Sequence, residues 1–144
     1  MSRALPVLHL SIWIDRDLAT VAAFLREPAN FPLWATGLAK GLKPAPGQPA
    51  EARVYLAAAP EGELLVRFSP PNDFGVADHW VTLPDGREIS IPLRAVANGT
   101  GSEVTLTLFR LPEMTDEIQE RDRDWVLRDL ARLKRVIEEQ TSRG

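Results

Sequence analysis

The sequence has 144 residues, of which 44% are hydrophobic and 26% are charged, a composition typical of a single globular domain over residues 1–144. Its 17 basic and 20 acidic residues give a formal net charge of -3 and form no basic block, so nucleic acid is not an expected partner. The lack of cysteine excludes disulfides and thiolate chemistry, and with two histidines no metal site is expected.

The N-terminal segment predicts a half-buried strand. In "LHLSIWI" (8–14) aliphatic residues alternate with His9, Ser11 and Trp13, the pattern of a strand with one face on the core, so His9 faces away from it. The run is too short to cross a bilayer, and no small-residue cleavage site follows it. We therefore expect no membrane span and a cytoplasmic location.

Two short helices are expected next. "RDLATVAAFLRE" (16–27) carries one apolar face, with Asp15 as a candidate N-cap and Pro28 as its stop. "NFPLWATGLAKG" (30–41) predicts a second short helix, or a bend, that holds Trp34.

Turns containing proline and glycine predict hairpins in the middle of the chain. With "PDG" (84–86) as a three-residue loop, Val81 lies opposite Ile89 and His79 opposite Ile91, on an inner row that is apolar except for His79. "PEG" (60–62), treated in the same way, places one set of residues on the core side and another on the outside. The inward set is Val54, Leu56, Leu64, Val66 and Phe68, and the outward set is Arg53, Tyr55 and Arg67.

"NGTG" (98–101) predicts a further hairpin as a four-residue loop. The facing pairs that follow are Ala95 with Val104, Leu93 with Leu106, Ile91 with Leu108 and Ile89 with Arg110. This register places Arg110 on the inner row, one step from the level of His79. A slip of one residue would move every side chain to the other face.

"TDEIQERDRDWVLRDLARLKRVIEEQ" (115–140) predicts a long amphipathic helix with Thr115 as its N-cap. Its apolar arc contains Ile118, Trp125, Val126, Leu130, Leu133, Val136 and Ile137. Asp122 and Asp129 lie near the centre of that arc, where an ionised carboxylate without a partner costs several kcal/mol. Each aspartate must therefore be paired, protonated, facing water or uncovered.

The helix must run back across the inner face of the sheet to bury its apolar arc. Asp122 should then lie near Arg110 and His79, and Asp129 about 10 Å further along the helix axis. One interpretation is a structural ion pair between Asp122 and Arg110, with His79 donating to a backbone carbonyl. The other is a cluster in a cavity that orients a ligand or moves a proton.

The chain resembles the SRPBCC or START-like superfamily, the fold shared by polyketide cyclases, aromatases and the birch-pollen allergen family. The resemblance rests on "HLSIWIDRDLATVAAFLREPANFPLWATGL", "FGVADHWVTLPDG", "IPLRAVANGTGSEVTLTLFRLPEMTDEI" and the terminal helix, which are similar to a bacterial subgroup. It implies an α+β helix-grip fold, in which a curved antiparallel sheet of six or seven strands wraps a long C-terminal helix. Two short helices follow the first strand, and a ligand cavity lies between the sheet and the long helix.

The function expected from these patterns is binding of a small hydrophobic or aromatic molecule, polyketide-like or lipid-like, in that cavity. The candidate ligand-binding residues are Trp34, Phe68, His79, Leu93, Leu108, Arg110, Asp122, Trp125 and Asp129. The alternative is a polyketide cyclase or aromatase that uses cavity Asp, His and Arg side chains as acids and bases. No catalytic residue is assigned and no cofactor is expected, because the chain lacks a nucleophile with an evident base and any cofactor fingerprint.

A third alternative is an interaction module whose cavity has collapsed. Trp80 is expected to project from the outer face beside Ser90, where an exposed aromatic side chain marks a candidate partner surface. A homodimer is one assembly that such a surface would serve.

Overall fold

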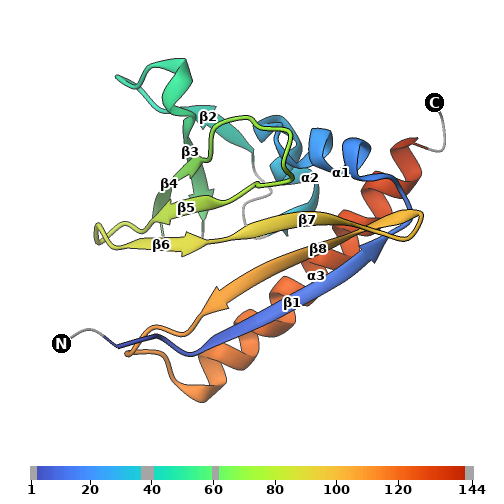
Figure 1. The fold of residues 1–144 in the computed structure, drawn as a ribbon. Coiled ribbons are helices and arrows are strands. Elements are labelled where there is room, and N and C mark those ends of the chain that lie inside the picture. Colours follow the sequence, from blue (N-terminus) through green and yellow to red (C-terminus); the bar gives the residue numbers. More distant parts are fainter. Residues whose placement is uncertain (1–2, 37–40, 60–61, 142–144) are drawn as a thin grey trace.

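The computed structural model describes residues 3–36, 41–59 and 62–141, which form two antiparallel sheets and a long C-terminal helix (Figure 1). The first sheet contains β1 (Val7–Ile14), β8 (Gly101–Phe109) and β7 (Leu93–Asn98), in that order. The second contains β2 (Leu42–Pro44), β3 (Val54–Ala59), β4 (Gly62–Phe68), β5 (His79–Thr82) and β6 (Glu88–Ile91), in that order. The described residues thus form eight strands in two sheets, where one sheet of six or seven was expected.

The helices follow the expected plan of two short helices and one long one. They are α1 (Leu18–Leu25), the 3₁₀ turn Pro28–Asn30, α2 (Phe31–Trp34), a second 3₁₀ turn Ala50–Ala52 and α3 (Asp116–Thr141). Asp17, and not Asp15, caps α1, since its side chain accepts from the Thr20 backbone N–H at 3.2 Å. The Thr115 hydroxyl accepts from the Ile118 N–H at 3.2 Å, as expected of the cap of α3.

One nearly continuous run of chain, β6 followed by β7, passes from one sheet to the other at Pro92. Before Pro92 the run pairs with β5, and His79 lies opposite Ile91. After Pro92 it pairs with β8, and Leu93 lies opposite Leu106. Both registers agree with those predicted from the turns, so the alternation of residues and the turn chemistry were sufficient to align these strands.

Pro92 also ends the pairing between β7 and β8. The Thr107 N–H donates to the Pro92 carbonyl at 3.0 Å, but the proline nitrogen has no hydrogen with which to complete the pair. The pairs expected beyond it do not form, and Arg110 follows the last residue of β8 rather than lying opposite Ile89. The predicted Ile89–Arg110 pair is therefore wrong, whereas Arg110 keeps the parity of Leu108 and contacts α3 through Asp116 and Gln119.

The register of β3 against β4 differs by one residue from the prediction. Ala59 lies opposite Gly62, and the predicted three-residue turn includes residues 60–61, which are outside the described part of the chain. The slip exchanges the two faces of β3. Tyr55 consequently points into the interior, with its ring centroid 5.7 Å from that of Phe68, and the prediction that Leu56 points inward is wrong.

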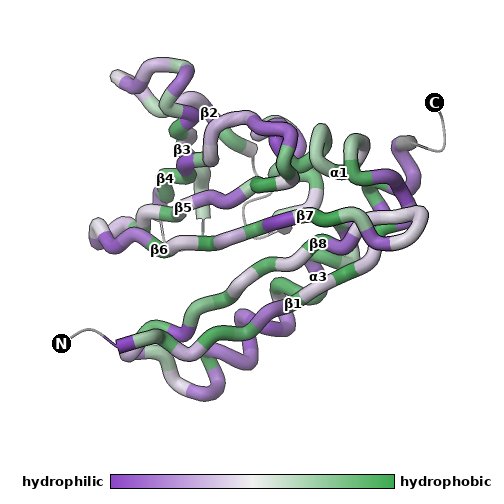
Figure 2. The backbone as a smooth tube through the Cα atoms, in the orientation of Figure 1, coloured by the Kyte–Doolittle hydropathy of each residue, from purple (hydrophilic) through white to green (hydrophobic). Residues whose placement is uncertain are grey.

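The core lies where α1 and the C-terminal half of α3 cover the first sheet. Figure 2 shows that hydrophobic residues alternate with more polar ones along β1 and β8. Along α3, each turn carries both hydrophobic and hydrophilic residues, as expected for a helix with one buried face. The large side chains with under 2% of their surface exposed are Ile14, Val21, Val66, Leu93, Val104, Leu130, Leu133 and Ile137. No helix in the described part of the chain is long and apolar enough to span a membrane.

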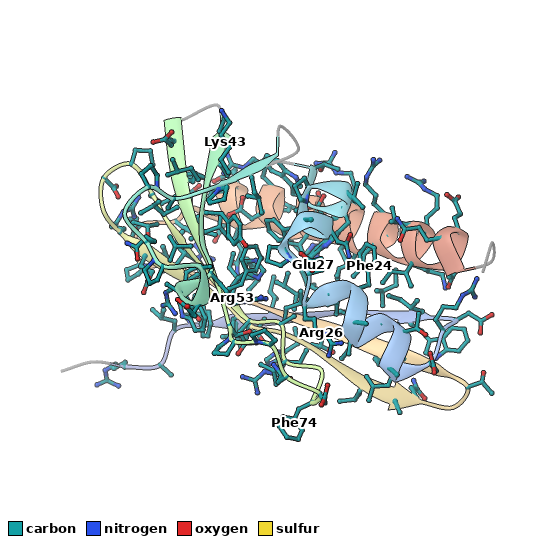
Figure 3. All side chains as sticks on the ribbon, turned by 90° about the horizontal axis from the view of Figure 1, so that it is seen from above. Phe24, Arg26, Glu27, Lys43, Arg53 and Phe74 are labelled. Atoms are coloured by element: carbon teal, nitrogen blue, oxygen red, sulfur yellow. The ribbon has the colours of Figure 1, made fainter. Side chains whose placement is uncertain are left out.

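Arg53 ties the end of α1 to the five-stranded sheet. Its guanidinium donates to the Arg26 carbonyl at 2.6 Å and to the Ser69 carbonyl at 3.0 Å, and Figure 3 shows Arg26 and Arg53 on neighbouring elements. Phe74, in the loop between β4 and β5, projects away from the molecule and is 83% exposed (Figure 3).

Candidate functional site

A cavity of about 270 Å³ lies between the N-terminal half of α3, α2, the five-stranded sheet and the end of β8. Its wall includes Phe31, Trp34, Ile89, Ile91, Leu108 and Trp125. Ile89 and Ile91 alternate along β6 and face the cavity from the sheet, whereas Trp125 faces it from α3. The wall is predominantly apolar, with a few polar side chains set into it, which is the usual composition of a site for a small organic molecule.

His79 is the buried polar side chain of the sheet wall, with 3% of its surface exposed. Its ring packs edge-on against the Phe31 ring, with the centroids 5.0 Å apart. Nδ1 lies 3.4 Å from the Ala77 carbonyl oxygen, and because a carbonyl can only accept, Nδ1 carries the proton. Burial lowers the pKa of His79 to about 4, so the imidazole is neutral at pH 7.

His79 has a second ring nitrogen, Nε2, and the residue belongs to the cavity wall. With the proton on Nδ1, Nε2 presents a bare lone pair that accepts a hydrogen bond. Among the described residues, every fully buried side-chain nitrogen or oxygen has a hydrogen-bond partner. The hydrogen bond of the His79 ring is the one from Nδ1 to Ala77, so Nε2 has no partner of its own within the described part of the chain. Nε2 must therefore retain accessible surface, and His79 is part of the cavity wall. This matches the interpretation in which His79 donates to a backbone carbonyl.

Asp129 contributes to the cavity wall from α3, whereas His79 contributes from the sheet. Asp129 is hydrogen-bonded to Thr36, which lies just after α2. Its Oδ1 accepts from the Thr36 hydroxyl at 2.8 Å and from the Thr36 N–H at 3.3 Å. The same hydroxyl oxygen lies 3.3 Å from Nε1 of Trp125, which donates to it. Desolvation by burial raises the pKa of Asp129 above its ordinary value. Asp129 is thus a partly buried carboxylate held by Thr36 at the cavity wall.

Asp122 lies two turns earlier on α3 and also contributes to the cavity wall. Its side chain is 24% exposed, and its ion pair, with an oxygen–nitrogen distance of 3.2 Å, is to the neighbouring Arg121. Arg110 instead pairs with Asp116 at 2.7 Å and donates to Gln119 at 3.0 Å. The predicted Asp122–Arg110 pair is therefore wrong, because Arg110 is engaged by residues of the start of α3 that precede Asp122. Asp122 faces water at the edge of the cavity.

Six of the nine candidate ligand-binding residues contribute to the cavity wall, and three do not. The six are Trp34, His79, Leu108, Asp122, Trp125 and Asp129. Phe68 lies behind the wall with its ring 5.4 Å from that of Phe31, Leu93 is 1% exposed in the core, and Arg110 lies beyond the end of β8.

Sequence reasoning missed several residues of the wall, among them Phe31, Ile89, Ile91 and Met114. The alternation in β6 already placed Ile89 and Ile91 on the inner row, so those two could have been nominated. The Thr36–Asp129 contact joins positions 93 apart in the chain and has no local signal. Within the described residues, no group of three or more histidine or acidic side chains is placed to hold a metal ion.

The structure is similar to solved structures over nearly its whole length. Ara h 8.0201 matches with a TM-score of 0.67 at 10% sequence identity, covering 94% of this chain and 99% of that chain. A START superfamily protein from Mycobacterium smegmatis matches with a TM-score of 0.64 at 11% identity, covering 93% and 98%. DynU16, from the dynemicin biosynthetic locus, matches with a TM-score of 0.67 at 13% identity, covering 92% of this chain and 47% of that chain.

No protein-family model and no curated protein matches the sequence. The chain has the SRPBCC or START-like helix-grip fold. The α+β architecture expected from the sequence, with short helices after the first strand and a long C-terminal helix, is thereby confirmed.

Proposed function

We propose that this protein binds a small hydrophobic or aromatic molecule in the cavity between α3 and the five-stranded sheet. The observation that carries the proposal is a mainly apolar cavity of about 270 Å³, partly open to solvent. Concave, mainly apolar sites with a few polar groups are the usual binding sites of small organic molecules. An apolar cavity of about 150 Å³ accommodates benzene, so this one has room for a molecule of about two fused rings.

The wall chemistry supports an aromatic occupant. Phe31, Trp34 and Trp125 give the cavity aromatic surface on two sides, and aromatic rings stack favourably on such surfaces. The fold is also that of a START superfamily protein.

Binding is favoured over acid–base catalysis by the positions of the polar groups. Arg110 is engaged by Asp116, so Asp122, Arg110 and His79 do not form one contacting cluster. A histidine with a pKa of about 4 is also a weak base at neutral pH.

Thermal unfolding in the presence of naphthalene and 2-naphthol tests the proposal. A ligand at 100 times its dissociation constant stabilises the folded state by about 2.7 kcal/mol, which raises Tm by several degrees. Val126→Trp fills the cavity from α3 and should abolish the rise. Leu127→Trp adds the same side chain at the next, exposed position and should preserve it. An unchanged Tm of the natural protein with both compounds, or an equal response of the two variants, contradicts the proposal.

A further inference from the structure

We infer that the cavity selects aromatic molecules that carry a hydrogen-bond donor, a hydroxyl or a protonated amine, and discriminates against carboxylates. This inference rests on the proposed function, because it specifies the ligand class of the same cavity. Its basis is that His79 and two aspartates of the described wall can accept hydrogen bonds, and that no lysine or arginine belongs to that wall.

The sheet side of the cavity offers one acceptor, Nε2 of His79. Its partner nitrogen is committed to Ala77, so the ring cannot donate into the cavity without breaking that bond or becoming charged. A charged imidazole is disfavoured at a site where only 3% of the residue is exposed. A ligand that lacks a donor would cover this lone pair and leave it unsatisfied, which costs free energy.

The helix side offers two carboxylates, Asp122 and Asp129. Of the two indoles in the wall, that of Trp125 on α3 already donates its Nε1–H to Thr36, and that of Trp34 comes from α2. No lysine or arginine contributes to the described wall. Ser90 is also at the wall, but Ile89 and Ile91 point inward, so strand alternation turns its hydroxyl to the other face.

The nearest cations lie outside the cavity wall. Asp122 pairs at 3.2 Å with Arg121, whose side chain is 63% exposed. Arg110 pairs with Asp116 beyond the end of β8. Arg128 and Arg132 act on Asp129 but are exposed on α3, and Arg132 donates to the Leu33 carbonyl at 2.7 Å. A ligand carboxylate would therefore be desolvated beside like charges, whereas an ammonium would meet opposite ones. The cavity is electrostatically complementary to neutral donors and to cations.

Four matched naphthalenes test the inference by isothermal titration at pH 7.5. They are 2-naphthol, 2-methoxynaphthalene, 2-naphthylmethylamine and 2-naphthoate, which share one ring system and differ in the polar group. We expect 2-naphthol to bind about tenfold more tightly than its methyl ether, the ratio that one hydrogen bond supplies. We expect 2-naphthylmethylamine to bind more tightly than 2-naphthoate, with 2-naphthoate the weakest of the four.

Variants assign the selectivity to residues. His79→Phe retains a ring and removes the acceptor, so the affinity ratio of naphthol to methyl ether should fall to about one, while His9→Phe, on the exposed face of β1, should leave it unchanged. Asp129→Asn should reduce the preference for the amine over the carboxylate, and Asp124→Asn, exposed on the same helix, should not. The four natural-protein affinities test the inference even if a variant fails to fold.

The outcomes separate the two proposals. If none of the four compounds binds, the proposed function and this inference both fail. If all four bind with equal affinity, or if 2-naphthoate binds most tightly, the cavity is a binding site and the inference is overturned. If the expected ranking is seen but persists in both His79→Phe and Asp129→Asn, selectivity does not arise from these acceptors and the inference is likewise overturned.

Discussion

The two halves of α3 have the same amphipathic pattern but different surroundings. In the C-terminal half, Leu130, Leu133 and Ile137 are each at most 1% exposed. In the N-terminal half, the corresponding arc presents Trp125 and Val126 to the cavity, and both remain partly exposed. One half of the helix is therefore packed core, and the other is the wall of a site. A carboxylate is tolerated in the arc only where the arc is not packed.

Polar contacts reinforce this difference. The C-terminal half is bonded to β1, since Lys134 donates to the Trp13 carbonyl at 2.9 Å and Glu138 accepts from the Asp15 N–H at 2.8 Å. The middle of α3 is bonded to the segment around α2, because Asp129 accepts from Thr36 and Arg132 donates to the Leu33 carbonyl. Because α2 and the chain just after it lie at the cavity, these contacts hold the wall in place around the space rather than fill it.

The largest expected effect comes from making a second cavity in the packed half. Leu133→Ala removes a side chain that is 0% exposed and should lower the free energy of unfolding by about 2–5 kcal/mol. Val126→Ala, beside the existing cavity, should cost about 1 kcal/mol or less, because its neighbours do not enclose it. Urea unfolding of both variants measures the contrast. Equal losses would mean that the two halves are packed alike.

The pH dependence of stability should report the burial of His79. Its pKa is about 6.5 when unfolded and about 4 when folded, so the unfolded chain binds the extra proton between these values. The contribution of His79 to the free energy of unfolding is therefore highest above pH 6.5, where the ring is neutral in both states. That contribution should fall by roughly 3 kcal/mol as the pH is lowered to 4. The difference in unfolding free energy between the natural protein and His79→Phe should change by that amount between pH 7 and pH 4. With His9→Phe, at an exposed position, the difference should stay constant, and a similar change there would show that His79 is not the source.

Asp129 should oppose stability at neutral pH. Because burial raises its pKa in the folded state, the ionised form at pH 7 is less favourable when folded than when unfolded. This cost is present above the raised pKa and disappears as the carboxylate is protonated at lower pH. Asp129→Asn retains an oxygen that can accept from Thr36 and should increase the free energy of unfolding at pH 7 by up to about 1 kcal/mol. A decrease in urea unfolding experiments would show that the charge itself is stabilising.

The smallest effect is expected at Asp122. Its pair joins it to the neighbouring Arg121, whose side chain is 63% exposed, and ion pairs that water reaches contribute little. Asp122→Asn should therefore change the free energy of unfolding by less than about 0.5 kcal/mol. A loss of several kcal/mol would instead indicate that the carboxylate has a buried partner.

The sequence was sufficient to predict the pairing of strands that are joined by a recognisable turn. It was not sufficient to predict contacts between residues far apart in the chain. The "PDG" turn fixed His79 opposite Ile91, because a three-residue loop leaves one register that keeps the apolar row on one face. The Ile89–Arg110 pair was predicted by extending the ladder between β7 and β8 past Pro92, whose nitrogen has no hydrogen to continue it. Ala59 lies opposite Gly62, one residue away from the predicted register, which was enough to exchange the faces of β3.

The candidate site was predicted in part for the same reason. His79 and Trp125 were nominated because period-two and helical patterns place them inward, and both contribute to the wall. Two aspartates in an apolar arc signalled a region of α3 that is not packed. Asp129 is bonded to Thr36, which lies just after α2, and Asp122 is paired with the exposed Arg121. Neither partner follows from the periodicity of the sequence. The single-domain organisation, the cytoplasmic location and the homodimer stay predictions.

The measurement that tests the account most directly is a set of nuclear Overhauser effects between 2-naphthol and the methyl groups of the protein. We predict contacts from the naphthol protons to the methyl groups of Ile91, Leu108 and Val126, which border the cavity, and none to Leu133 or Ile137 in the packed half of α3. Contacts confined to exposed methyl groups such as those of Val96 or Leu127 would place the ligand on the surface and contradict the account.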